Sequence, residues 1–279
     1  MNYQLSLTPY RLSLKRYPMH FIVCIKQVPN TTNVQIDQKT NTLKREGVES
    51  IINPFDEFAI EEAVRLKERT GGKTTVITMG PPQAENALRE AIGRGIDNAI
   101  LISDRAFAGA DTWATSYTLA SAIKKIGDYD LIICGKQATD GDTAQVGPGI
   151  AEMLDIPHVA YVKKIEEITP EKAKVERMME DGYDIIEMPL PSLITVVKEI
   201  NTPRMPSLRG MMASKKAQIP HWTAQEINAE STNIGLTGSP TQVMKIFTPP
   251  QRPGGEKLEG SPEEMAASLT DKLKQLQII

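Results

Sequence analysis

The amino-acid sequence predicts an α/β protein: a doubly wound, mostly parallel sheet with antiparallel additions and a C-terminal extension. Between residues 20 and 154, apolar strand-like runs alternate four times with amphipathic helical patterns. Such alternation is typical of parallel strands joined by right-handed crossovers. The first run, HFIVCIKQV at 20–28, is a continuous β-rich segment, as expected for a strand buried on both faces.

The predicted elements follow one another at short intervals. Residues 33–45 alternate polar and apolar side chains around a polar centre, which predicts a hairpin. Asn53 is a suitable N-cap and Pro54 a suitable first residue for a helix that ends at Gly71. The later units are predicted as strands at 74–80, 98–104 and 129–135, and as helices at 82–95, 111–127 and 143–154.

The pattern changes after residue 157. Four short β-rich segments lie between 159 and 198, and we expect them to form an antiparallel addition to the sheet. A polar stretch rich in Pro, Gly and Ser then leads to a C-terminal helix, where Ser261 and Glu264 form a capping box. The apolar stripe of this helix suits either a partner subunit or its own domain. The stripe consists of Met265, Leu269, Leu273 and Leu276.

We predict three parts of the chain. Residues 1–18 contain three basic residues, no acid and no apolar segment of the kind a secretory signal needs, and we expect them to be flexible. Residues 19–220 form the α/β domain, and residues 221–279 form a C-terminal arm and helix.

Composition excludes several classes of function. A net charge of -3 does not favour a nucleic-acid partner. No apolar run reaches the roughly 18 residues of a membrane span. Cys24 and Cys134 lie in strand-like runs without metal-ligand spacing, which indicates buried thiols in a reducing, cytoplasmic compartment. We expect no metal site and no catalytic residues, because the sequence has no P-loop, GxSxG motif or Ser/His/Asp constellation.

The stretch GKQATDGDTAQVGP at 135–148 is the most informative one. It follows a strand and opens a helix, so unpaired N–H groups and the helix dipole can bind phosphate there. Thr143 adds a hydroxyl, Gln145 an amide, and Gly141 lets the backbone turn.

The two acids in this stretch leave three readings open. Asp142 can cap the helix, and Asp140 can face a ribose hydroxyl. Alternatively, the two carboxylates form a Mg²⁺ pair, or the loop is a plain capped turn. An ATP-using enzyme on a similar fold is a further class, although the sequence has no motif that would position a triphosphate.

Several segments together resemble the β-subunit of electron-transfer flavoproteins, from about residue 19 to 279. They include CIKQVPNT, INPFDEFAIEEAVRLKE, LIICGKQATDGDTAQVGPGIAEML and TVVKEINTPRMPSLRGMMASKKA. The resemblance implies a heterodimer whose α-subunit carries an FAD, and an adenine nucleotide within this chain. The family's nucleotide-binding positions correspond to Cys24, Asn53, Pro54, Phe55, Asp56, Met79, Gly80, Gly135, Lys136, Gln137, Ala138, Thr139, Asp140, Gly141, Asp142, Thr143, Ala144, Gln145 and Val146.

In one branch of the family the nucleotide is a structural AMP. In the other it is a second FAD, which accepts a hydride from NADH and splits the electrons between the α-subunit FAD and ferredoxin or flavodoxin. DGDTAQVGP resembles this bifurcating branch. Gly141, Thr143, Ala144 and Val146 are small enough to leave room beyond the first phosphate. The chain would then oxidise NADH only within its complex.

The segment at about 203–212 resembles the family's recognition loop. The resemblance implies that Leu208 is an apolar anchor for an acyl-CoA dehydrogenase or another flavin dehydrogenase. Arg204, Met205 and Met211 would accompany it at an adaptable interface. The alternative is an ordinary helix start that packs on the chain itself.

Overall fold

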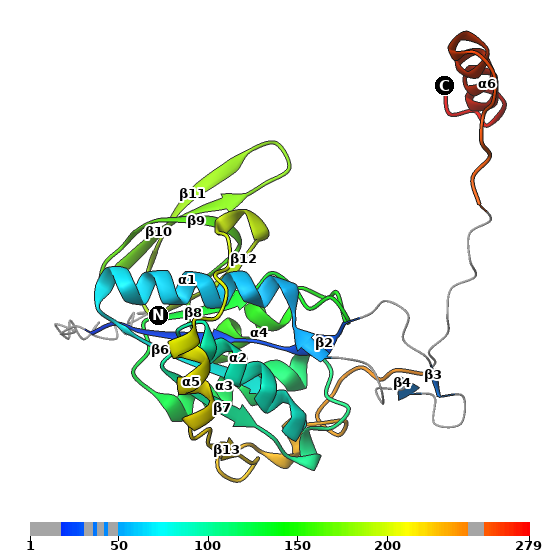
Figure 1. The fold of residues 1–279 in the computed structure, drawn as a ribbon. Helices are drawn as coiled ribbons and strands as arrows, with labels where there is room; N and C mark the ends of the chain where they lie inside the picture. The colour runs from blue at the N-terminus through cyan, green and yellow to red at the C-terminus, as the bar shows by residue number, and fades with distance from the viewer. Residues whose placement is uncertain (1–17, 31–35, 38–41, 44–49, 245–253) are drawn as a thin grey trace, which may run out of the picture. The chain divides into compact units, whose positions relative to one another are not determined.

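The computed structural model describes residues 18–30, 36–37, 42–43, 50–244 and 254–279. The main unit extends to Met244 and is built on a nine-stranded sheet, of order β11-β10-β9-β12-β8-β1-β6-β7-β13 (Figure 1). Its strands are β1 (His20–Cys24), β6 (Lys73–Met79), β7 (Asn98–Ile102), β8 (Leu131–Gly135), β9 (His158–Ile168), β10 (Lys172–Met178), β11 (Tyr183–Pro189), β12 (Ser192–Val196) and β13 (His221–Trp222). The helices are α1 (Pro54–Thr70), α2 (Glu85–Gly93), α3 (Thr112–Ile126), α4 (Val146–Leu154), α5 (Leu208–Lys216) and, in the second unit, α6 (Pro262–Gln275).

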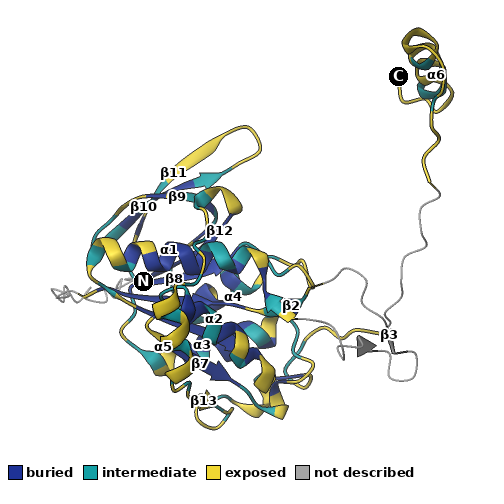
Figure 2. Ribbon diagram, viewed as in Figure 1, coloured by how far each residue is buried: buried dark blue, intermediate teal, exposed yellow. Residues whose placement is uncertain are grey.

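The predicted α/β class is confirmed, with one correction to its topology. β12 lies between β8 and β9 and pairs in parallel with both, so the antiparallel pairings of this sheet are those of β10 with β9 and with β11. All five residues of β12 are buried, because a parallel strand inside the sheet is covered on both faces. By contrast, β11, the last strand at this end of the sheet, is largely exposed (Figure 2).

The first predicted strand, 20–28, is two separate elements. β1 ends at Cys24, and β2 (Gln27–Pro29) pairs instead with β5 (Ser50–Ile52). The chain leaves the main sheet at Lys26, whose N–H donates to Asp56 and whose carbonyl accepts from the N–H of Asn53. In the predicted hairpin, β3 (Ile36–Asp37) and β4 (Thr42–Leu43) pair antiparallel, and its remaining residues lie outside the described residues.

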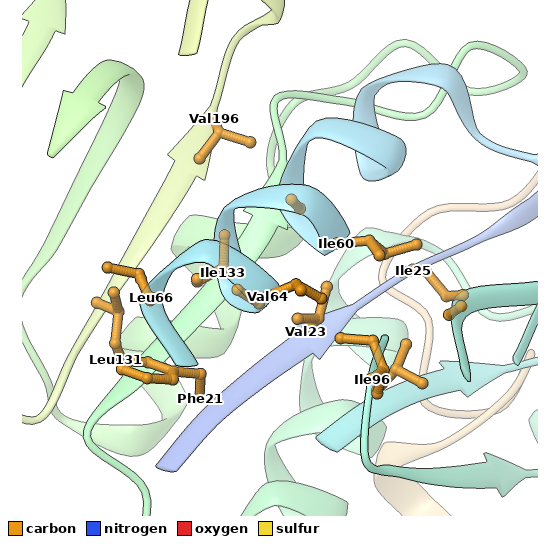
Figure 3. Close-up of a cluster of buried hydrophobic side chains, with 14 of the residues drawn as sticks. Phe21, Val23, Ile25, Ile60, Val64, Leu66, Ile96, Leu131, Ile133 and Val196 are labelled. Atoms are coloured by element: carbon orange, nitrogen blue, oxygen red, sulfur yellow. The ribbon is translucent and has the colours of Figure 1, made fainter. Parts of the chain in front are cut away.

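Each face of the sheet has its own core. Alternate residues of β1 enter opposite clusters, so Phe21 packs towards α1 and α2, while Ile22 packs towards α3 and α4. Figure 3 shows the first cluster, where Ile60 and Leu66 of α1 lie over the strands. The strand order reverses between β1 and β8, since β6 and β7 follow on one side and β12 and β9 lie on the other. Ligands of doubly wound sheets bind at such a reversal, beyond the carboxyl ends of the strands.

The main unit continues past the boundary that we expected at residue 220. β13 pairs in parallel with β7, and Ile227 and Ile234 are buried in the core. The second unit comprises Lys245–Ile279. Its helix has the predicted capping box of Ser261 and Glu264, but it has no buried residue. Within the described residues, no helix combines the length and the apolarity that crossing a membrane requires.

His20, at the start of β1, is a buried histidine with both ring nitrogens engaged. Nδ1 lies 2.9 Å from the carbonyl oxygen of Asp128, and Nε2 lies 2.8 Å from Oγ1 of Thr75. Since a carbonyl only accepts, Nδ1 carries the proton, and neutral Nε2 accepts from the threonine hydroxyl. Burial lowers the pKa of His20 below 6.5, which outweighs the opposing effect of the Asp128 carbonyl.

We expect His20 to make stability depend on pH. The unfolded chain binds a proton more readily than the folded one, so the free energy of unfolding should fall as pH drops below about 6.5. Each unit by which the folded pKa is depressed corresponds to about 1.4 kcal/mol. Urea unfolding of His20→Gln between pH 5 and pH 8 should show a flatter dependence than the wild type. A wild-type slope in His20→Gln would contradict the assignment.

Candidate nucleotide-binding site

The end of β8 passes directly beneath the start of α1. Cys24 of β1 and Cys134 of β8 are neighbours in the parallel register, and both are buried. A Cβ at Gly135 would lie 2.3 Å from Oδ1 of Asp56 and 2.7 Å from the carbonyl carbon of Phe55. Only glycine therefore lets β8 run this close to the helix and places the following loop at the strand ends.

Asn53 holds that loop from the other side. Its Nδ2 donates to the carbonyl of Gln137 at 2.8 Å, and its Oδ1 accepts from the N–H of Thr139 at 3.1 Å. Asn53 occupies the predicted N-cap position of α1, but its side chain makes no capping bond. Asn53 therefore binds the loop instead of capping the helix. Its side-chain amide is completely buried, and both its nitrogen and its oxygen have hydrogen-bond partners in the loop.

Asp56 is a buried carboxyl at the centre of this junction. Its Oδ2 accepts from the N–H of Lys26 at 2.7 Å. Burial raises the pKa of Asp56 to about 7, against the opposing effect of hydrogen bonds from Asn53, Lys26 and Gly135. Near neutral pH the carboxyl is therefore charged only part of the time, which limits its repulsion of a nearby anion.

The acids of the loop are paired with side chains of the same site. Asp140 Oδ1 lies 2.6 Å from Nζ of Lys26, so a cation offsets its charge. Asp142 accepts from Nε2 of Gln137, and its own N–H donates to the carbonyl of Ala138 at 2.8 Å. The prediction that Asp142 caps the helix is therefore wrong. The described residues contain no group of three or more His, Cys, Asp or Glu side chains that could hold a metal ion.

The helix after the loop begins later than predicted, at Val146 rather than at 143. Ala144 has a φ of +55°, and the N-cap residue Gln145 has a φ of -105° and makes no side-chain cap. A left-handed residue followed by a right-handed one turns successive N–H groups towards one point, which forms an anion-binding concavity. No acceptor among the described residues takes the N–H groups of Val146 and Gly147. This start of α4 can bind a phosphate.

Two glycines fix where α4 starts. A Cβ at Gly147 would lie 2.6 Å from Cγ2 of Thr195 on β12, and one at Gly149 would lie 2.5 Å from Oγ of Ser116 on α3. The hydroxyl of Ser116 also donates to the carbonyl of Val146 at 3.2 Å. Close packing against both elements therefore holds the first turn of α4 at the carboxyl edge of the sheet.

The structure brings most of the predicted nucleotide-binding positions to the carboxyl edge of the sheet, where they make different kinds of contact. Met79 ends β6, beside β1, and the N–H of Gly80 donates to the carbonyl of Ile102 at 3.0 Å. Gly141 and Thr143 are exposed at the tip of the loop. Sequence reasoning missed Lys26, which stands in the quoted CIKQVPNT, because its pairing with Asp140 depends on the fold.

In the predicted docking segment, the side chain of Arg204 does not point to solvent for a partner. It binds carboxylates of α1 instead. Arg204 donates through Nε to Glu61 at 2.8 Å and through Nη1 to Glu68 at 2.6 Å. These bonds, the one to Glu68 first, raise the pKa of Arg204 above its usual value. Arg204 therefore fastens the segment to α1, while Met205 and Leu208 stay 83% and 79% exposed.

α5, which Leu208 begins, packs closely on α2. A Cβ at Gly210 would lie 2.1 Å from the carbonyl oxygen of Gly93, so the two helices meet at glycines. Arg89 of α2 donates to the carbonyl of Ser214 at 2.6 Å near the end of α5. An exposed apolar surface thus stands on a rigid support. It consists of Met205, Leu208, Met211 and Met212, and we call it the α5 surface.

A model of the electron transfer flavoprotein domain matches residues 40–227, which is more than half of the chain. The chain belongs to the electron transfer flavoprotein family. It is 52% identical, over 94% of its length and 100% of the relative's, to an electron transfer flavoprotein subunit beta of Thermoanaerobacterium thermosaccharolyticum. It is 51% identical, over 94% and 100%, to the caffeyl-CoA reductase-Etf complex subunit CarD of Acetobacterium woodii.

The chain is also similar to protein FixA of Bradyrhizobium diazoefficiens. It is 45% identical over 91% of each chain. The resemblance to the family's β-subunits is confirmed by these matches, and the relatives' names imply an α-subunit partner. The nucleotide-loop and docking assignments remain predictions.

We expect Gly135→Ala to damage the site, because its methyl group would collide with the backbone of α1. It should lower the free energy of unfolding by about 1–3 kcal/mol. Gly141→Ala is the matched control, since a Cβ there meets nothing within 4 Å, and it should change stability by less than about 0.5 kcal/mol. Chemical denaturation of both variants measures this, and equal stabilities would contradict the close approach.

Proposed function

We propose that this chain is the β-subunit of a heterodimeric, electron-bifurcating flavoprotein. It binds an FAD that accepts a hydride from NADH and divides the electrons between the α-subunit FAD and ferredoxin or flavodoxin. The observation that carries this proposal is the start of α4, where Val146 and Gly147 offer free N–H groups within a loop of small side chains. FAD, when bound, supplies the hydride and one-electron chemistry.

The residues of the loop fit a dinucleotide. The N–H groups of Val146 and Gly147 suit one phosphate, and the concavity at Ala144 extends the same donor surface. Gly141 and Thr143 are exposed and small, so the path beyond the first phosphate is not filled by a large side chain. An AMP would use only the first part of this surface, and we keep it as the alternative ligand.

Charge in the loop also suits a phosphate ligand. Lys26 offsets Asp140, and the raised pKa of Asp56 leaves that carboxyl partly neutral near pH 7. The protein's own residues thus bind and orient the nucleotide without acting on it chemically. Two relatives support the redox reading, since CarD belongs to a caffeyl-CoA reductase-Etf complex by name and the other is named a flavoprotein subunit.

The α-subunit is the partner that we assign to α6. Isolated helices shorter than about 12–15 residues are only marginally stable in water. α6 has 14 residues and none of them is buried, while Leu269 and Leu276 of its apolar stripe are exposed. A groove on the α-subunit would cover this stripe and stabilise the helix.

The α5 surface is the docking site that we propose for a flavin dehydrogenase, such as an acyl-CoA dehydrogenase. Its methionines can adapt their shape to a partner, and Leu208 is the most exposed leucine among the described residues. Because Arg204 and the glycine contact of α5 with α2 fix the backbone, docking there loses little conformational freedom.

Cofactor content tests the proposed nucleotide. The purified αβ heterodimer should release two FAD molecules when it is denatured, as measured by absorbance and by chromatography of the supernatant. One FAD and one AMP per heterodimer would show that the chain holds AMP instead.

Leu208→Ala should weaken electron transfer to the dehydrogenase by about tenfold or more in kcat/KM, as expected for a central apolar anchor. Reduction of the flavin by NADH in the isolated heterodimer should stay unchanged. Ile185→Ala, on the exposed strand β11, is the control and should affect neither rate. Equal loss of both rates in Leu208→Ala would indicate a packing role instead.

A further inference from the structure

Tyr161 on β9 has a backbone conformation that aromatic residues rarely adopt. Its φ is +60°, in the left-handed region that favours glycine. Its N–H donates to Oγ1 of Thr195 at 3.1 Å, and the pairing of β9 with β12 shifts register between Ile194 and Val196. Residues held in such conformations concentrate at functional sites, where the surrounding structure maintains the strain.

The ring of Tyr161 is one of two aromatic rings near the same ammonium group. Nζ of Lys136 lies 5.5 Å from the centroid of Tyr161 and 5.7 Å from that of Phe55. Both distances are within the range of cation–π attraction. Lys136 is half-buried, and no carboxylate among the described residues forms an ion pair with it. Lys26, at the same edge, differs because Asp140 offsets its charge.

Thr195 connects this lysine to the phosphate-binding end of α4. Its hydroxyl accepts the Tyr161 N–H, and its methyl carbon Cγ2 is the atom that a Cβ at Gly147 would meet at 2.6 Å. Thr195 thus binds the N–H of the strained residue through its hydroxyl, and its methyl group lies against the backbone of Gly147 in the first turn of α4. Lys136 itself stands in the loop that leads from β8 to α4.

We propose that Tyr161 is a positioning residue, which together with Phe55 holds the uncompensated ammonium of Lys136 for a phosphate of the bound nucleotide. Aromatic faces attract and orient a cation without cancelling its charge, whereas a carboxylate would cancel it. From its left-handed position on β9, Tyr161 places its ring 5.5 Å from Nζ of Lys136. The inference rests on the proposed nucleotide site, but it holds for AMP as well as for FAD.

The test uses the full αβ heterodimer stripped of its nucleotide, with AMP, ADP and FAD as calorimetric probes. Lys136→Met should weaken binding by about tenfold at low salt, and the loss should shrink as salt rises. Tyr161→Phe keeps a ring and should bind like the wild type. Tyr161→Asn removes the ring but tolerates the left-handed backbone, and it should bind about three- to tenfold more weakly.

Two comparisons separate positioning from a structural role. In the Lys136→Met background, Tyr161→Asn should cause no further loss of affinity, because the cation that it positions is gone. The thermal midpoint of Tyr161→Asn should not fall, since asparagine relieves the backbone strain. A full additional loss in the double variant, or a midpoint that falls together with affinity, would overturn the proposal.

The probes also separate this inference from the proposed function. If the stripped wild type binds AMP but not FAD, the bifurcating function fails, and the variants ranked with AMP still decide the role of Tyr161. If FAD binds and Tyr161→Asn binds it as tightly as the wild type does, the positioning role fails and the proposed function stands.

Discussion

The contact between the start of α1 and the end of β8 is the constraint on which the site depends. Gly135 allows this contact because it has no side chain. A Cβ at this position would lie only 2.7 Å from the carbonyl carbon of Phe55. Asn53 then binds the loop at Gln137 and Thr139, and Asp56 receives the N–H of Lys26. The turn that contains Asn53 and Asp56 therefore binds the chain just after both β1 and β8, the two strands between which the strand order reverses. Because the loop is fixed there, its other end can present free N–H groups.

The contact of α1 with β8 also determines which charges lie uncompensated at the carboxyl edge of the sheet. A loop that contains acids can receive a phosphate only if their charges are offset, and Lys26 does so for Asp140. Burial leaves Asp56 partly neutral near pH 7. Lys136, between Phe55 and Tyr161, adds a positive charge that no described carboxylate offsets. The site is therefore less acidic than its sequence indicates, and its dominant donors are backbone N–H groups and lysines.

The partner surfaces that we propose lie on other parts of the chain. The α5 surface stands on α2 through the contact of Gly210 with Gly93, and Arg204 ties its first residues to α1. α1 therefore supports both the loop after β8, at its N-terminus, and the proposed docking segment, through Glu61 and Glu68 in its later turns. α6 belongs to a separate unit, and none of its residues is buried.

The sequence by itself determined the alternation of strands and helices, the position of the loop and the capping box at Ser261, because each depends on residues close together in the chain. It could not decide which groups the polar side chains bind. Lys26 and Asp140 are 114 positions apart, and Arg204 and Glu61 are 143 apart. Side chains so distant in sequence meet only when the sheet assembles. For that reason Asn53, a predicted helix cap, binds the loop after β8, and Arg204, a predicted docking residue, binds carboxylates of α1.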